Sequence, residues 1–273
     1  MRASTPEHWD RYWDERKETI EEVYSNEDRI LRQLEGLPLT GRRILEVGAG
    51  SGRDSLELAR RGARVFVIDY VRSSFGVIRR QAREQELTIH AVCADATRMP
   101  FRDGTFALVF HQGLLEHFRD PNPLVSENYR VLEDGGHCLI DVPQRWHVYT
   151  LAKHALILVN RWFAGWETEY SPGQLEALMR RHGFSIVRTG GDWFRPGFFY
   201  RGLRYVLMRG RIARLPLHPR GPKLLGVPGE WIRGRLRGTR LGLHTYAMIG
   251  TLGRKNAASR PGGGGAQRGG EKG

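Results

Sequence analysis

The feature that most constrains the fold is a glycine-rich turn between two short apolar runs. Arg43-Ile-Leu-Glu-Val47 and Arg64-Val-Phe-Val-Ile68 are rich in aliphatic and β-branched residues, and a helical stretch over about 54–61 separates them. Strand, helix and strand at this spacing predict a βαβ unit. Glycines in the intervening turn, Glu46-Val-Gly-Ala-Gly-Ser-Gly52, allow positive φ angles and let a ligand approach the backbone closely.

The alternation of strands and helices continues along most of the chain. It predicts an α/β fold with a mainly parallel, doubly wound sheet and helices on both faces. A length of 273 residues with 40% hydrophobic content suits one elaborated domain better than two separate ones. The further expected elements are helix 72–86, strand 89–93, strand 106–110, helix 122–132, strand 137–142, helix 174–182, strand 184–188 and a last strand at about 243–252.

Two segments interrupt this alternation, and both are expected to be insertions in a single domain over 1–255. The stretch 144–170 carries six Trp, Tyr and Phe residues around an apolar helical run and is predicted to form a lid. The stretch 192–240 is rich in Gly, Pro, Arg and aromatic residues and is predicted to be a basic insertion before the last strand. The other parts are a helical cap over 1–40, a cofactor-binding half over 41–142 and a disordered Gly-rich tail over 256–273.

Positive charge is concentrated toward the C-terminus. The net charge is +13, and the stretch 188–260 alone holds sixteen Lys and Arg against Asp192 and Glu230. Aromatic and aliphatic residues are interleaved with these charges, a mixture suited to the headgroup region of an anionic membrane. An RNA-docking surface and a solvated rim over packed aromatic residues are the alternatives.

Cysteine usage and hydropathy exclude several other classes of protein. Cys93 and Cys138 both lie in predicted strands, so neither a disulfide framework nor a Cys-based zinc site is expected. The N-terminus is polar and lacks the apolar core of a secretory signal, and no run approaches the roughly 20 apolar residues that span a bilayer. We therefore expect a cytoplasmic protein, soluble or peripheral at the membrane.

The glycine turn carries the wrong charges for a pyrophosphate ligand. A dinucleotide-binding turn places a small residue where this chain has Arg53. Glu46, directly before the turn, would repel a phosphate in a partly desolvated pocket. A ligand with a cationic amino-acid end, a ribose and an adenine suits Glu46 better, and NAD is not expected to bind.

Two more acids lie after the next two predicted strands. Asp69 ends the second strand, where a carboxylate can accept hydrogen bonds from both ribose hydroxyls, and Tyr70 beside it could lie against adenine. Asp95 comes after the third strand, where it can accept from an exocyclic amine while the N–H of Ala96 reads a ring nitrogen. Because the carboxyl ends of these strands meet at one edge of the sheet, all three acids are expected to line one crevice. A helix cap or a turn is the alternative role for each.

Six motifs occur in order along the first half of the chain. They are Ile44-Leu-Glu-Val-Gly-Ala-Gly-Ser-Gly52, Val67-Ile-Asp-Tyr70, Ala94-Asp-Ala-Thr-Arg-Met-Pro-Phe101, Phe106-Ala-Leu-Val-Phe-His-Gln112, Leu115-Glu-His-Phe118 and Arg130-Val-Leu-Glu-Asp-Gly-Gly136. With these motifs, residues 41–142 resemble the class I S-adenosylmethionine-dependent methyltransferases. The resemblance implies a seven-stranded Rossmann-like sheet with an antiparallel last strand, and S-adenosylmethionine as the cofactor.

The resemblance also implies roles for single residues by their positions. His111, just past the fourth strand, would line the sulfonium side of the pocket. Asp69 would hold the ribose, and Asp95 with Ala96 would read the adenine. The residues that would face the methionine end are Glu46, Gly48, Ala49, Gly50 and Gly52.

The residues directly after the fourth strand constrain the acceptor. His111-Gln112-Gly113 stands where nucleic-acid amino-methyltransferases of this fold carry Asn or Asp before Pro-Pro and an aromatic residue, which argues against methylation of base nitrogens. Leu115-Glu-His-Phe118 resembles the branch that acts on small molecules, quinone rings and lipid-like substrates. Some members of that branch hold a metal with a second Glu; because Gly113 occupies that position, no metal is expected.

His117 is the candidate general base, because a neutral imidazole can take a proton from a hydroxyl group as it is methylated. A structural helix residue bonded to the backbone is the alternative. Trp9, Tyr12 and Trp13 fall on one face of a predicted helix, a spacing that indicates packing. The resemblance implies a second role, because an N-terminal helix often closes the cofactor pocket in this family, which would bring Tyr12 to the carboxylate end of the cofactor.

The sequence therefore predicts an S-adenosylmethionine-dependent methyltransferase that acts on a small or lipid-like acceptor by in-line displacement. Methylation of oxygen, nitrogen and carbon all remain open. The alternatives are an RNA-directed methyltransferase that docks through the basic insertion and a non-catalytic cofactor-binding protein on the same scaffold.

Overall fold

The structure is a computed structural model. It describes residues 5–16, 28–160, 162, 166–194, 196–216, 231 and 233–256. The predictions for the Gly-rich tail and for much of the basic insertion, 217–230, lie outside the described residues.

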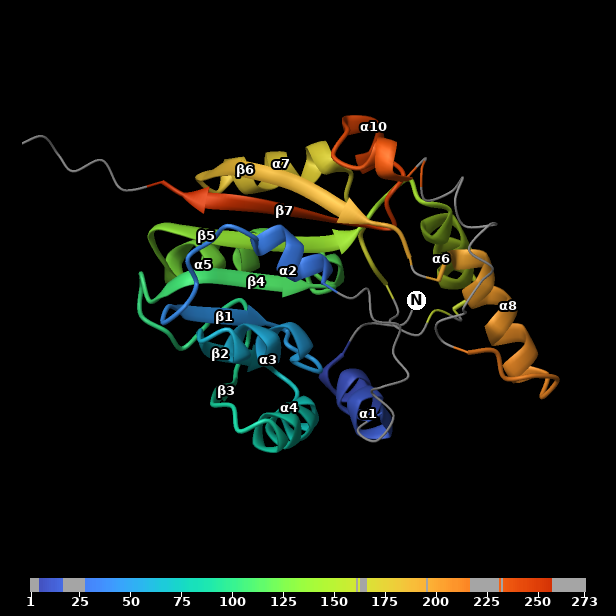
Figure 1. Cartoon of the computed structure of the whole chain (residues 1–273), viewed down its shortest axis with the longest axis horizontal. Helices are drawn as coiled ribbons and strands as arrows, with labels where there is room; N and C mark the ends of the chain where they lie inside the picture. Colours follow the sequence, from blue (N-terminus) through green and yellow to red (C-terminus); the bar gives the residue numbers. More distant parts are fainter. Residues whose placement is uncertain are drawn as a thin grey trace, which may run out of the picture.

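A seven-stranded sheet in the order β3-β2-β1-β4-β5-β7-β6 forms the centre of the molecule (Figure 1). The first five strands are parallel, and β7 lies between β5 and β6, antiparallel to both. The predicted doubly wound sheet with an antiparallel last strand is therefore confirmed. The strands are β1 (Arg43–Val47), β2 (Arg64–Asp69), β3 (Ile89–Cys93), β4 (Phe106–Gln112), β5 (Leu132–Pro143), β6 (Phe184–Asp192) and β7 (Met248–Lys255).

Helices cover both faces of the sheet and bury two separate apolar clusters. On one face, α2, α3 and α4 contribute Ile30, Leu58 and Ile78. On the other face, α5 and α7 contribute Leu124 and Leu175. The helices with these apolar faces are α2 (Arg29–Leu34), α3 (Arg53–Arg60), α4 (Arg72–Glu84), α5 (Asn122–Val131) and α7 (Pro172–Arg181).

The carboxyl ends of the parallel strands face a third group of helices (Figure 1). These helices are α1 (Pro6–Arg16), α6 (Val148–Leu158) in the predicted lid and α8 (Phe198–Arg209) in the basic insertion. The chain runs from β1 outward to β2 and β3 and then returns to β4 on the other side of β1. Such a reversal opens a crevice at the carboxyl ends of the strands, which is where open α/β sheets bind ligands. No helix in the described part of the chain is long and apolar enough to cross a membrane.

The last two strands differ in their bounds from the prediction. The side chain of Thr239 accepts a hydrogen bond from the N–H of Gly242 and begins the short helix α10 (Arg240–Leu243), so β7 starts at Met248 rather than near 243. β6 continues past two glycines to Asp192. A Cβ on Gly191 would lie 2.3 Å from the carbonyl oxygen of Met248, so a glycine is required for this close strand pairing.

Candidate active site

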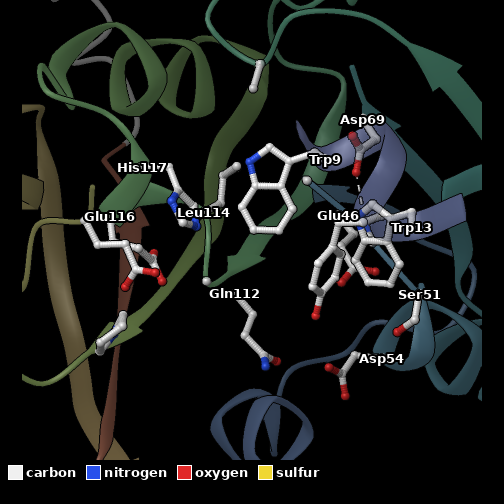
Figure 2. A pocket seen from close by; sticks show the side chains of 18 of the residues that line it. Trp9, Trp13, Glu46, Ser51, Asp54, Asp69, Gln112, Leu114, Glu116 and His117 are labelled. Atoms are coloured by element: carbon white, nitrogen blue, oxygen red, sulfur yellow. Dashed lines mark hydrogen bonds between the residues drawn. The ribbon is translucent and has the colours of Figure 1, made fainter. Parts of the chain in front are cut away.

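A cleft of about 870 Å³ opens at the carboxyl ends of β1, β2 and β4. Figure 2 shows two groups of side chains at its opposite sides. Glu46, Asp54 and Asp69 lie on one side, and Glu116 with His117 lies on the other. Trp9, Leu114 and Gln112 are drawn between the two groups. The cleft therefore has two chemically different halves.

The glycine turn forms the floor of the first half. The N–H groups of Gly48 and Ala49 donate hydrogen bonds to the carbonyl of Ile68, at 2.8 and 3.4 Å, which ties the turn to the end of β2. Gly50 has a φ angle of +50°, and a Cβ there would lie 2.5 Å from Cζ2 of Trp13. Only glycine therefore allows the α1 indole to lie directly on the turn.

Glu46 is buried at the end of β1, and its Oε2 has no hydrogen-bond partner among the described residues. Burial and the nearby Asp54 raise the pKa of this carboxyl to about 8, although Ser55 and Arg53 act in the opposite direction. A buried acceptor without a partner is costly. The site is therefore built to receive a donor, and a cationic one would restore the charge of the carboxylate.

Arg29 faces the same half of the cleft and was not anticipated from the sequence. Its Nη2 lies 2.7 Å from Oδ1 of Asp141, and both side chains are buried. Burial raises the pKa of Asp141 to about 7, which Arg29 counteracts. The Nε of Arg29 has no partner among the described residues. An unpaired acid and a guanidinium with a free donor together suit a zwitterionic amino-acid group.

Asp69 ends β2 with both carboxylate oxygens close to the turn. Oδ2 accepts from the N–H of Gly50 at 3.3 Å, and Oδ1 accepts from the N–H of Val71 at 3.0 Å. Burial raises the pKa of Asp69, which these backbone donors partly offset. The adjacent Tyr70 is 41% exposed and also lines the cleft, so the pair can contact a sugar and a flat ring.

Asp95 and Ala96 line the same edge beyond Asp69. Oδ1 of Asp95 accepts two hydrogen bonds from Thr97, from its N–H and from its hydroxyl group, each at 2.8 Å. Asp95 therefore fills the structural role of a turn acid as well as facing the cleft. This is the alternative that the sequence left open for it.

The structure does not place His111 at the cleft, contrary to the expectation from the sequence. Its imidazole is fully buried inside β4, and burial lowers its pKa to about 3. Alternate residues of a strand point to opposite sides, so the next residue, Gln112, lines the cleft instead. We leave His111 out of the proposed cofactor site for this reason.

Glu116 and His117 lie together in the short 3-10 helix η2 (Leu115–His117). Burial lowers the pKa of His117; a hydrogen bond with the backbone of Trp166 acts in the opposite direction. Its Nδ1 has no partner among the described residues, and its ring packs edge-on against Trp9 at 5.1 Å. His117 is thus both bonded to backbone and directed at the cleft. Burial and the neighbouring Glu167 raise the pKa of Glu116 well above its ordinary value.

Aromatic side chains from distant segments form the walls of this second half. Tyr149 of the lid lies 5.0 Å from Phe194 and 5.8 Å from Trp162, in edge-on contacts. All three line the cleft together with Trp9 and Phe118. A planar or apolar group is the ligand that such walls accommodate best.

A buried ionic network lies behind these walls. Nζ of Lys153 lies 2.6 Å from Oε2 of Glu167 and 2.7 Å from Oε1 of Glu169. Oε2 of Glu169 lies 2.8 Å from Nε2 of His154, and Trp162 donates to Glu167 at 2.7 Å. Burial favours a lower pKa for Lys153, but the two carboxylates raise it. In the described part of the chain, no group of three or more His, Cys, Asp or Glu side chains is arranged to hold a metal ion.

The first half of the cleft therefore offers an acid and a guanidinium for an amino-acid end, a carboxylate for a ribose, and an exposed aromatic ring for a base. This donor set is suited to a nucleoside linked to an amino acid. Comparison with known proteins makes this assignment more specific.

A family model described as a methyltransferase domain matches residues 45–140. A ubiquinone biosynthesis O-methyltransferase from a Ruegeria species is 29% identical over 164 residues, which cover 58% of this chain and 66% of that protein. A demethylmenaquinone methyltransferase from Clavibacter sepedonicus is 36% identical over 103 residues, covering 38% and 42% of the two chains. The chain thus spans two thirds or less of the length of these curated relatives.

Solved structures share the fold. A SAM-dependent methyltransferase from Thermotoga maritima superimposes with a TM-score of 0.61 at 17% identity, covering 92% of this chain and 99% of that chain. Residues 45–140 therefore form a methyltransferase domain of the class I, S-adenosylmethionine-dependent type, and S-adenosylmethionine is its cofactor. The unpartnered Oε2 of Glu46 and the glycine turn fit this cofactor.

Proposed function

We propose that this methyltransferase transfers a methyl group to a hydroxyl group on the ring of a small, lipid-like acceptor, by in-line displacement. The single observation that carries the proposal is the second half of the cleft. It joins the cofactor half directly, has aromatic walls, and holds Glu116 and His117. The names of the ubiquinone and menaquinone methyltransferases among the relatives support the same class of acceptor.

In this proposal the residues of the first half bind the cofactor. Glu46 accepts hydrogen bonds from the ammonium group, and Arg29 donates to the carboxylate. Asp69 accepts from the ribose hydroxyls, and Tyr70 lies against the adenine. Asp95 accepts a hydrogen bond from the exocyclic amine of the adenine, and the N–H of Ala96 donates one to a ring nitrogen. Bound S-adenosylmethionine supplies a methyl group activated by a positive sulfur.

The second half orients the acceptor. Ring walls formed by Trp9, Tyr149 and Phe194 hold a flat group and exclude water, which strengthens the electrostatic interactions inside. His117 accepts a hydrogen bond from the hydroxyl group through Nδ1. Alignment of the oxygen with the methyl group supplies much of the acceleration, because two reactants become one bound assembly.

Methyl transfer from radiolabelled S-adenosylmethionine tests this function. We expect transfer to a catechol with a short prenyl chain, presented in detergent micelles, and little transfer to tRNA or to a free amino acid. Tyr149→Ala should raise KM for the catechol about tenfold, because it removes a wall of the acceptor half. Val187→Ala, exposed on β6 and outside the cleft, is the control. Transfer to tRNA in place of the catechol would contradict the proposal.

We further propose that the acceptor is reached at an anionic membrane surface. Apolar side chains of α6 and α8, both near the cleft mouth, lie exposed to solvent: Leu151 is 68%, Leu158 83%, Leu203 53% and Val206 61% exposed. No acidic residue occurs between Asp192 and Glu230, which leaves the charge of the segment positive. Apolar side chains beside arginines suit insertion among anionic headgroups.

Sedimentation with liposomes tests the membrane proposal. We expect binding to phosphatidylglycerol vesicles that weakens with salt, and little binding to phosphatidylcholine, since each basic residue near an anionic leaflet contributes about 1 kcal/mol. Leu203→Ser with Val206→Ser should reduce binding severalfold, whereas Val187→Ser with Leu241→Ser, exposed elsewhere, should not. A preference for RNA over vesicles in a competition experiment would contradict the membrane proposal.

A further inference from the structure

Methylation of a hydroxyl group releases a proton inside the cleft, and this proton must leave. The C–O bond forms with an electron pair of the acceptor oxygen, the pair of the breaking C–S bond stays on sulfur, and the O–H proton is left over. The cleft at this point is lined by aromatic rings and buried groups rather than by open solvent. A base and an exit route are therefore required.

Glu116 is a buried carboxyl in the acceptor half that can accept this proton. It is 3% exposed, and its Oε2 has no hydrogen-bond partner among the described residues although it lines the cleft. Figure 2 shows its carboxyl group beside His117. His117 keeps its role of orienting the hydroxyl group, since burial lowers its pKa and so weakens it as a base.

A chain of ionisable groups runs to the surface from Glu167, whose charge acts on Glu116. Glu167, which also lines the cleft, is one of the charges that act on Glu116; Lys153 and Asp141 are the others. Hydrogen bonds of 2.6 Å from Lys153 to Glu167 and of 2.8 Å between His154 and Glu169 are then joined by an ion pair of 2.7 Å between Lys153 and Oε1 of Glu169. The side chain of Lys153 is completely buried, but that of His154 is 50% exposed. One end of this chain lies in the acceptor half, and the other end reaches solvent.

A buried ion network gives little net stability by comparison with apolar packing, so stability alone does not account for these buried charges. We propose that Glu116 takes the proton of the acceptor and that Glu167, Lys153, Glu169 and His154 relay it to solvent. This inference rests on the proposed function. Glu116 passes its proton to Glu167, and Lys153 gives one proton to Glu169 while it takes that proton from Glu167. Glu169 passes its proton to His154, which releases one from its other nitrogen to water, so that every group returns to its starting state. One proton thus leaves the cleft for each methyl group transferred.

Single-turnover methylation of the catechol probe tests the relay. His154→Ala should slow the chemical step about tenfold, and added imidazole should restore it in a concentration-dependent way, because the site of His154 is open to solvent. His244→Ala, an exposed histidine at the end of α10, is the control and should behave as wild type. Glu116→Gln should abolish the step without imidazole rescue, while S-adenosylhomocysteine still binds. Wild-type rates in His154→Ala, or a loss that imidazole leaves unchanged, would overturn the relay.

A second measurement needs no acceptor and therefore separates failure of the relay from failure of the proposed function. The infrared carbonyl band of a protonated carboxyl shifts when its proton exchanges in D₂O. In the complex with S-adenosylhomocysteine, held at a pH low enough to protonate Glu116, a band that is absent from Glu116→Gln should exchange fast in wild type, slowly in His154→Ala, and fast again with imidazole. Equal exchange in wild type and His154→Ala would refute the relay even if the catechol is methylated.

Discussion

The cofactor half depends on a few carboxylates whose surroundings change their chemistry, and Glu46 gives the clearest prediction. Because burial raises its pKa to about 8, most of the free protein carries a neutral Glu46 at pH 7. Binding of a cationic ammonium group requires the ionised form. The complex should therefore release close to one proton at pH 7, and affinity should rise as the pH approaches 8.

Calorimetry in buffers of different ionisation enthalpy measures this proton directly. S-adenosylhomocysteine is the titrant, and Glu46→Gln is the comparison because it keeps the shape of the side chain and has no proton to release. An equal heat in all buffers for the wild-type protein would show that Glu46 is not the group that meets the ammonium.

Asp69 gives a prediction of magnitude. Asp69→Ala should weaken S-adenosylhomocysteine by about 1.5 to 3 kcal/mol, the usual range for hydrogen bonds to a charged group. This is roughly tenfold or more in dissociation constant. Titration calorimetry gives the affinity, and circular dichroism checks the fold. Asp134→Ala, an exposed acid of β5 that does not line the cleft, is the matched control. Unchanged affinity in a folded Asp69→Ala protein would remove Asp69 from the site.

Sequence reasoning found the residues that lie in motifs and missed those that reach the cleft from elsewhere. Glu46, Asp69 and Asp95 could be predicted from their places at strand ends, and the structure brings all three to one cleft. Arg29 lies before β1 in no motif, and only the packing of α2 directs it there. The sequence predicted that His111 lines the cleft, but the next residue, Gln112, lines it instead. The direction of a side chain depends on where the strand ends, which the sequence does not fix to one residue. The ion pairs of Lys153 could not be predicted from the sequence, because they form only when the lid folds.

At the level of elements, the predicted strands and helices around the glycine turn have nearly the observed bounds. Their apolar runs are short and end at clear turn signals, so local sequence determines them. The far edge was harder to predict. Gly190 and Gly191 suggest a break, yet β6 continues through them because β7 and Tyr246 pack closely there. Tertiary contacts, rather than local preference, set those bounds.

Helix α1 closes the cofactor half, and its indole rings should report cofactor binding. Trp13 lies on Gly50, and Trp9 touches His117. S-adenosylhomocysteine should change the tryptophan fluorescence of the protein, and Trp13→Phe should remove most of that change because the ring lies against the turn. Trp231→Phe is the control, since that side chain is 63% exposed and does not line the cleft. A full fluorescence change in Trp13→Phe would show that α1 does not contact the cofactor.

The molecule as a whole combines a central sheet with a cleft that is bordered by separate segments of the chain. The strand ends carry the residues proposed to bind the cofactor, while α1, the lid and the segment around α8 supply the walls of the proposed acceptor half (Figure 1). This division explains how a common scaffold acquires a particular acceptor, since the bordering segments can differ without altering the sheet. It also places the exposed apolar side chains of α6 and α8 beside the entrance of the cleft.

Calorimetric titration of the purified protein with S-adenosylmethionine and with NAD tests the central claim most directly. The charges of the glycine turn, with Glu46 facing the ligand, predict that S-adenosylmethionine or S-adenosylhomocysteine binds and that NAD does not. Glu46→Gln should lose much of the binding. Micromolar binding of NAD together with no binding of S-adenosylmethionine would contradict the assignment of the cleft.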